Sequence, residues 1–175
     1  MASKKHYILT SITLGAIAAA SALLIGASNM LTKDKIAQNE QNKIHSGIAS
    51  IFGDSAEILK ENNIENDSYK YVNYCYQISS GEKEVGIAYR TTGSNMYGKI
   101  SLLIGYNLEN EFVSLSIITN EQTYASTLKD NYIDLLNKGE RELDDVSCGA
   151  TYGAKLVRDM IKEAKQADLD KVWNK

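Results

Sequence analysis

The feature that most constrains this chain is an uncharged apolar run near its N-terminus, from Tyr7 to Leu31. Its roughly 25 residues exceed the about 20 that a helix needs to cross the hydrocarbon core of a bilayer. Lys4 and Lys5 precede the run, and positive charge on this side favours a cytoplasmic N-terminus. We therefore expect residues 1–31 to form a cytoplasmic tip and a transmembrane anchor in the cell (inner) membrane, with the remaining chain on the extracytoplasmic side.

A cleaved signal peptide is the alternative interpretation of this run. Small residues from Gly26 to Ser28 could serve as a cleavage site. The run is long for the apolar core of a signal peptide, which spans about 7–15 residues. Its length favours an anchor that stays in the membrane.

A polar helix is predicted directly after the anchor. Ile36, Ile44, Ile48 and Ile51 recur at near-helical intervals among polar residues, and a Gly-Asp pair follows them as a helix end. We expect a stalk helix over residues 32–53.

Residues 54–175 are predicted to form one extracytoplasmic α+β domain. Its first part, 55–66, is rich in Asn and Asp, which predicts a short helix or an irregular segment. Apolar residues then alternate with other residues in three segments and run almost continuously in a fourth, which predicts an antiparallel sheet. These four strands are expected at 72–78, 85–89, 100–106 and 112–118. Helical spacing in 126–139 and from about 151 to 167 predicts flanking helices.

The composition excludes several classes of function. A net charge of −3 without a run rich in Lys and Arg excludes nucleic acid as a partner. The two histidines, His6 and His45, fall in the predicted cytoplasmic tip and stalk, so Cys148 lacks a base for nucleophilic catalysis. Two Cys and two His without close pair spacing do not assemble a zinc site. We therefore predict no catalytic residue and no metal site.

The segment "GSNMYGKIS", residues 93–101, approaches the pattern of a phosphate-binding loop. Ile100 stands where that loop needs a Ser or Thr for magnesium, and a strand pattern follows in place of a helix. We interpret the segment as a hairpin turn that contains glycine.

The two cysteines, Cys75 and Cys148, would lie outside the cytoplasm, where disulfides persist. They are far apart in the sequence, and both a disulfide and two free buried thiols remain open.

The segment "DDVSCGATYGAK", residues 144–155, carries the main candidate site. Gly149 and Ala150 have almost no side chain, so they leave room for a large group beside Thr151. Thr151 lies where the last helix should begin, and a helix N-terminus presents free N–H groups that stabilise a phosphate. The alternative is that Thr151 only caps this helix.

The pattern Asp145-x-x-Cys148-Gly149-Ala150-Thr151 resembles the flavinylation motif of the RnfG/NqrC family of FMN-binding domains. In that family a flavin transferase esterifies FMN, through its phosphate, to the Thr of the motif. The order of anchor, polar helix, strands and closing helix is also similar over nearly the whole chain. The resemblance implies covalent FMN on Thr151, with Asp145 as part of the sequence that the transferase recognises.

The chain departs from the family pattern around this site. Cys148 stands where Ser or Thr is usual, and Gly153 replaces a second Thr. The family's Glu-Thr-Pro-Gly-Leu-Gly loop corresponds to residues 121–126, which lack the Pro and Gly residues. Within this segment we expect Glu121 to keep the role of the Glu in the family's loop, and we expect Tyr124 to pack on the flavin.

The resemblance implies a membrane-anchored electron carrier, the G-type subunit of an Rnf-like ferredoxin:NAD oxidoreductase ion pump. Its partners would be the other membrane and peripheral subunits, and it would be an electron-transfer subunit of the translocase rather than a catalyst on its own. The alternatives are an NqrC-like subunit, a stand-alone flavinylated protein for extracellular electron transfer, and a structural or assembly subunit with a decayed flavin site.

Overall fold

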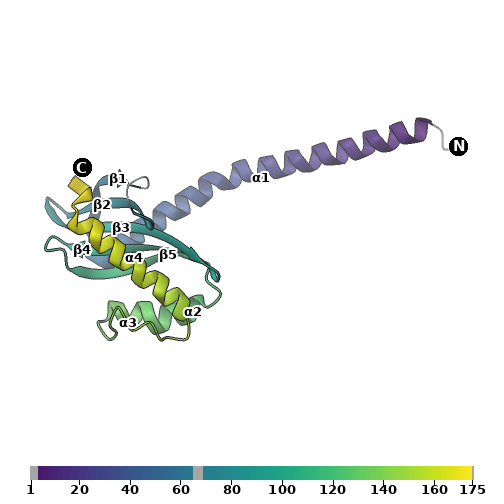
Figure 1. The fold of residues 1–175 in the computed structure, drawn as a ribbon. Coiled ribbons are helices and arrows are strands. Elements are labelled where there is room, and N and C mark those ends of the chain that lie inside the picture. The colour runs from purple at the N-terminus through teal and green to yellow at the C-terminus, as the bar shows by residue number, and fades with distance from the viewer. Residues whose placement is uncertain (1–3, 65–68, 175) are drawn as a thin grey trace. The chain divides into compact units, whose positions relative to one another are not determined.

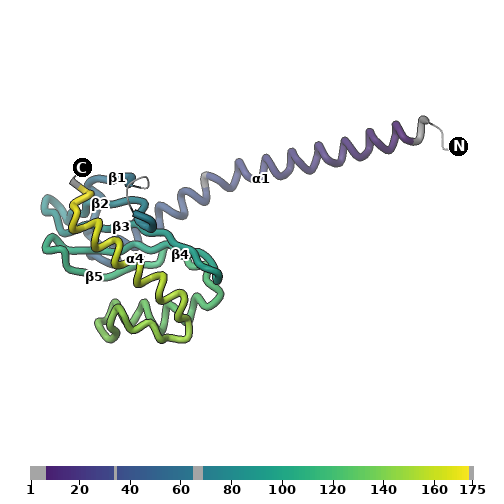
Figure 2. The backbone as a smooth tube through the Cα atoms, in the orientation of Figure 1, coloured from purple at the N-terminus to yellow at the C-terminus, as the bar shows by residue number. Residues whose placement is uncertain are grey.

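A computed structural model of the protein describes residues 4–64 and 69–174, and Figures 1 and 2 show its backbone. The first helix and the strands are α1 (Lys4–Phe52), β1 (Ala56–Asn63), β2 (Val72–Ser80), β3 (Lys83–Asn95), β4 (Gly98–Asn107) and β5 (Phe112–Asn120). The later helices are α2 (Ala125–Leu128), the π-helical η1 (Lys129–Ile133), α3 (Asp134–Asn137), α4 (Thr151–Leu169) and the 3₁₀-helical η2 (Val172–Asn174).

The contacts within the chain separate it into two units, one up to Asn42 and one from Lys43 onward. The first unit contains the apolar part of α1. All large apolar side chains between Tyr7 and Leu31 are exposed, and the helix is long and apolar enough to cross a membrane. The expected apolar helix is therefore present, in keeping with a single-pass membrane protein.

The predicted anchor and stalk form one continuous helix. α1 has no break between them and ends at Phe52, directly before Gly53. Gly53 has a φ of +99°, a backbone conformation that glycine adopts easily and that commonly ends a helix.

The second unit contains a five-stranded antiparallel sheet in the order β1-β2-β3-β4-β5, in which every strand pairs with its sequence neighbours. The α+β class predicted from the sequence is confirmed. The helical segment expected at 126–139 is present as α2, η1 and α3, and the last expected helix is α4.

The interpretation of residues 55–66 as a short helix or irregular segment was wrong where the structure describes them. Residues 56–63 form β1, an edge strand whose register shifts between Ile58 and Lys60; residues 65 and 66 lie outside the described part. Most of the strand is exposed, so it lacks the apolar alternation that marks a half-buried strand. Its place in the sheet comes from backbone pairing with β2, with Ala56 and Ile58 packed at the edge of a hydrophobic cluster.

One face of the sheet is covered by the last turns of α1. Ile44, Ile48 and Ile51 pack there with Tyr76, Ile78, Ala88, Leu103 and Ile118. Glycine makes the close approach possible, because a Cβ added to Gly86 would lie 2.7 Å from Cε1 of Phe52. This end of the helix is therefore part of the hydrophobic core of the second unit.

The opposite face is covered by α4, which crosses the sheet in Figure 1, and by the α2–α3 segment. Leu156, Val157, Met160 and Ile161 of α4 pack into the larger hydrophobic cluster, together with Tyr132 of η1. The sheet is thus apolar on both sides, and helices from opposite ends of the sequence cover it.

A buried carboxyl group lies near the C-terminal end of α4. Asp168 is only 1% exposed, and its Oδ1 accepts a hydrogen bond of 3.0 Å from the hydroxyl of Tyr89. Its Oδ2 is buried without a partner among the described residues. Burial raises the pKa of Asp168, although the hydrogen bond from Tyr89 opposes this effect.

This raised pKa predicts a pH-dependent stability. Above about pH 4 the unfolded chain ionises Asp168 while the folded chain still retains the proton. The free energy of unfolding should therefore fall as the pH rises from about 4 through the folded pKa. Asp168→Asn should flatten this dependence, as measured by denaturant titration at pH 4.5–8 with Trp173 fluorescence as the signal. Asp130→Asn, at an exposed position, is the control and should keep the wild-type slope; an unchanged slope in Asp168→Asn would contradict the assignment.

Candidate functional site

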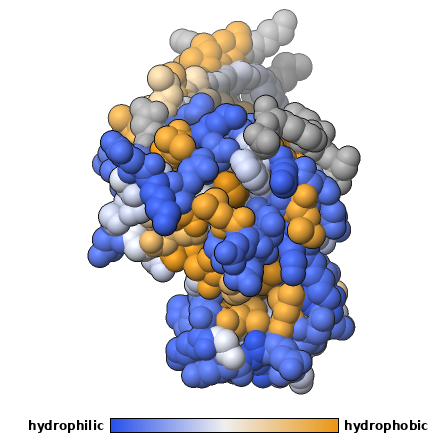
Figure 3. Space-filling view, turned by 90° about the vertical axis from the view of Figure 1, so that its left-hand side faces the viewer, coloured by the Kyte–Doolittle hydropathy of each residue, from blue (hydrophilic) through white to orange (hydrophobic). Residues whose placement is uncertain are grey.

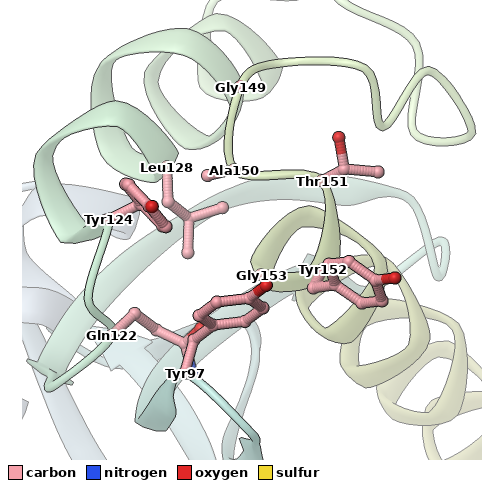
Figure 4. A pocket seen from close by; sticks show the side chains of 9 residues that line it. All are labelled: Tyr97, Gln122, Tyr124, Leu128, Gly149, Ala150, Thr151, Tyr152 and Gly153. Atoms are coloured by element: carbon pink, nitrogen blue, oxygen red, sulfur yellow. The ribbon is translucent and has the colours of Figure 1, made fainter.

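A pocket of about 360 Å³ lies where four parts of the second unit meet: the β3–β4 hairpin, the loop after β5, α2 and the start of α4 (Figure 4). Its volume is within the range of about 300–1,000 Å³ that is typical of small-molecule sites. It is lined by Tyr97, Gln122, Tyr124, Leu128, Gly149, Ala150, Thr151, Tyr152 and Gly153.

The hairpin positions Tyr97. β3 ends at Asn95, whose Oδ1 accepts a hydrogen bond of 2.8 Å from the backbone N–H of Tyr97. Gly98 follows with a φ of +130°, and a Cβ there would collide with the carbonyl oxygen of Glu121. The predicted hairpin turn is confirmed, and only glycine fits at its last position.

The loop after β5 holds this hairpin in place. The backbone N–H of Thr123 donates to the carbonyl of Tyr97, and that of Glu121 donates to the carbonyl of Lys99, both at 2.8 Å. The buried side chain of Gln122 donates to the carbonyl of Gly98. These bonds fix the backbone of Tyr97, and with it one wall of the pocket.

Three tyrosines gather at the pocket. The ring of Tyr97 lies 5.9 Å from that of Tyr124 and 5.6 Å from that of Tyr152, measured between centroids. Tyr124 and Tyr152 are 52% and 59% exposed, so their rings are accessible to a ligand. The group offers aromatic faces on which a planar ring could stack.

The opposite side of the pocket is the N-terminus of α4. Gly149 has a φ of +82°, Ala150 is the N-cap, and Thr151 is the first helical residue. No side chain caps this helix, so Thr151 does not have the capping role considered above. In Figure 4 its hydroxyl points away from Tyr97. The start of α4 therefore retains free N–H groups beside an accessible hydroxyl.

A cation lies on the same side of α4 as Thr151. Lys155 is four residues further along, a spacing that places two side chains on one helix face. Its Nζ lies 5.8 Å from the ring centroid of Tyr152. The lysine and the helix dipole both favour negative charge at this end of the pocket.

The loop before α4 is braced by basic residues. Arg141 pairs with Asp145 at 3.5 Å, and the Oδ1 of Asp145 accepts a hydrogen bond from the N–H of Ser147. Lys162 donates to Asp144 at 2.6 Å, and this bond lowers the pKa of that carboxyl. Asp144 and Asp145 are thus exposed, and their carboxylates are held by contacts with α4 and with the loop before it.

The structure brings together some of the residues selected from the sequence and not others. Thr151, Ala150, Gly149 and Tyr124 line the pocket. The remaining three, Asp145, Cys148 and Glu121, do not. Asp145 and Glu121 are exposed beside it, and Cys148 packs in the core cluster.

The cysteines are free and buried. Cys75 lies in the sheet, where burial raises the pKa of its thiol to about 11. Cys148 is 7% exposed, and its carbonyl accepts a hydrogen bond of 3.3 Å from Asn131. Of the two alternatives left open by the sequence, the structure has free buried thiols.

Sequence reasoning did not identify five residues of the pocket. These are Tyr97, Gln122, Leu128, Tyr152 and Gly153. Tyr152 and Gly153 follow Thr151 directly, and their position alone could have selected them. Tyr97 and Gln122 come from a hairpin and a loop that only the fold brings to the motif.

The first 51 residues match the family described as the RnfG N-terminal region, which supports an RnfG-family protein. The resemblance proposed from the sequence is confirmed to this extent. The match covers nearly all of α1 and does not include the pocket. No curated protein matches the chain.

The packing of α4 against α2 gives a prediction for Gly153. A Cβ at this position would lie 2.9 Å from Cδ2 of Leu128, which is fully buried. Gly153→Val should therefore overpack this contact and lower the free energy of unfolding by about 1–3 kcal/mol. Denaturant unfolding followed by Trp173 fluorescence measures the change. Lys155→Val, at an exposed position of the same helix, should shift it by no more than about 0.5 kcal/mol; equal losses in both variants would show that the contact is not tight.

Proposed function

Because its first 51 residues match the RnfG N-terminal region, we propose that this chain is the membrane-anchored flavoprotein subunit of an Rnf-like ferredoxin:NAD oxidoreductase ion pump. FMN is attached through its phosphate to Thr151, and the domain works on the extracytoplasmic side. The observation that carries the proposal is the position of Thr151, an accessible hydroxyl at an uncapped helix start on the rim of an aromatic pocket.

The attachment site suits a phosphoester. A flavin transferase would form the bond between Oγ1 of Thr151 and the phosphorus of FMN; the hydroxyl proton leaves, and the flavin donor loses the former substituent of its phosphate. The ester keeps negative charge, which the free N–H groups of α4 and the charge of Lys155 stabilise. Because Gly149 and Ala150 have almost no side chain, they leave room for the phosphate of FMN beside Thr151.

The pocket suits the ring system of the flavin. Tyr97 is held by backbone hydrogen bonds, and Tyr124 and Tyr152 lie beside it with exposed rings. These residues would orient a planar aromatic ring at the surface, where it stays accessible to redox partners. When bound, the flavin supplies the electron transfer, and the chain supplies attachment, orientation and local charge.

Two further functions share this site. An NqrC-like subunit or a stand-alone extracellular electron carrier would carry the same flavin, whereas a structural subunit would carry none. Co-purification of other membrane redox subunits with the full-length chain separates a complex subunit from a stand-alone carrier. The match to the RnfG N-terminal region favours the complex subunit.

The attachment is tested by intact mass. Chain co-produced with a flavin transferase should carry the mass of one esterified FMN and fluoresce in a denaturing gel. Thr151→Val, which removes only the hydroxyl function at similar size, should lose both signals completely. Thr151→Ser should retain part of them, and Thr127→Val, at a nearby residue, should retain them fully. An adduct that persists in Thr151→Val would refute the assignment of Thr151.

The ring site is tested separately from the attachment. Tyr97→Leu should keep the covalent mass but remove an aromatic surface next to the flavin. We expect stronger flavin fluorescence and a shifted visible absorption band, because tyrosine rings in contact with flavin quench its emission. Tyr74→Leu changes a tyrosine that stacks on Tyr76 instead, and its spectrum should match the wild type. Identical spectra for both variants would place the ring outside this pocket.

A further inference from the structure

A second cavity lies between the sheet and the segment that follows α3. It has a volume of about 220 Å³ and is lined by Tyr106, Phe112, Leu136, Arg141, Leu143, Ile161 and Lys165. Figure 3 shows hydrophobic side chains gathered in a hollow of the second unit, between its helical lower part and the sheet above. None of these residues lines the pocket beside Thr151.

The floor and walls of this cavity are apolar and aromatic. The rings of Tyr106 and Phe112 meet edge to face, with centroids 6.2 Å apart. The hydroxyl of Tyr106 is already used, because it donates to the carbonyl of Ile161 at 2.9 Å. Phe112 is 38% exposed and could be covered by an additional apolar group. A ligand here would bury an apolar body and find no polar partner at the floor.

Two cations line the same cavity, and no carboxylate does. The Arg141 side chain is only 16% exposed. Its guanidinium pairs with the exposed carboxylate of Asp145 at 3.5 Å and donates long hydrogen bonds, at 3.3 Å to the carbonyl of Asp145 and at 3.4 Å to that of Ser147. Lys165 has no ion pair within the described residues. The ammonium of Lys165 is therefore available to an incoming anion, and Arg141, with five N–H donors and only long contacts, can exchange its contact with Asp145 for a closer one.

We propose that this cavity binds a small amphipathic monocarboxylate, with its apolar body on Phe112 and Tyr106 and its carboxylate between Arg141 and Lys165. Charged donors above an apolar floor select for this chemistry, because the anion gains charge-assisted hydrogen bonds while the body leaves water. A neutral molecule of the same shape gains only from the removal of its apolar body from water.

The site is connected to the motif through Arg141. The same guanidinium contacts the backbone of Asp145 and Ser147, which belong to the loop that leads to Thr151. A carboxylate that binds Arg141 would compete for these N–H groups with the carbonyls of Asp145 and Ser147 and with the side chain of Asp145. Occupation of the cavity would therefore loosen the loop before α4. The binding itself does not depend on the flavin.

The test uses the full chain in lipid nanodiscs, with empty nanodiscs as the blank. Equilibrium dialysis with 2-naphthoate should give saturable binding at one site per chain. Arg141→Gln and Lys165→Gln should each weaken it about tenfold, as expected for the loss of one charged hydrogen-bond donor. Lys83→Gln removes an exposed cation outside the cavity and should leave binding unchanged. Leu136→Trp should abolish binding because the larger ring fills the cavity.

Three further probes define the ligand. The neutral 2-naphthalenemethanol should bind at least tenfold more weakly than 2-naphthoate. The monocarboxylate decanoate should compete with 2-naphthoate for the site, and a failure to compete would contradict the proposed class of ligand. Light-activated 4-benzoylbenzoate should label peptides from the segment 136–165. Absence of saturable 2-naphthoate binding, equal binding of the neutral alcohol, or equal losses in the Lys83→Gln control would overturn the proposal.

Discussion

The structure depends on one constraint, which is that the five-stranded sheet is apolar on both faces. If the strands stood alone, both apolar faces of the sheet would contact water, so helices must cover each side. The last turns of α1 supply one cover through Ile44, Ile48 and Ile51, and α4 supplies the other. The helix that carries the apolar run and the helix that begins with Thr151 are therefore both required for the same core.

This arrangement also explains how the candidate site is built. α4 must lie flat on the sheet to bury Leu156 and Met160, and its first turn then reaches the end of the β3–β4 hairpin. The hairpin is tied to the loop after β5 through the carbonyls of Tyr97 and Gly98. The pocket walls are thus extensions of well-packed elements, which is what a site needs to hold a ring in a defined orientation.

Much of the fold could be predicted because the spacing of apolar residues along the sequence follows the positions that are buried. The central strands and α4 each have one regular pattern of buried positions, and the apolar run can be recognised by its length and lack of charge. β1 could not be predicted, since this edge strand is mostly exposed and its two partly buried apolar residues, Ala56 and Ile58, make too short a pattern. The site divides in the same way: Thr151, Gly149 and Ala150 lie in one local motif, whereas Tyr97 and Gln122 reach the pocket through tertiary packing that no local pattern encodes.

The continuity of α1 has a practical consequence for work with a soluble form of the domain. A truncation placed after Phe52, at the visible end of the helix, would strip Tyr76, Ile78, Ala88 and Leu103 of their cover and leave a hydrophobic sheet face in water. Such a fragment would self-associate through that face. A fragment that begins near Lys43, where the contacts of the second unit begin, keeps the covering turns and omits the lipid-facing run. The physical border between anchor and domain therefore falls inside a helix.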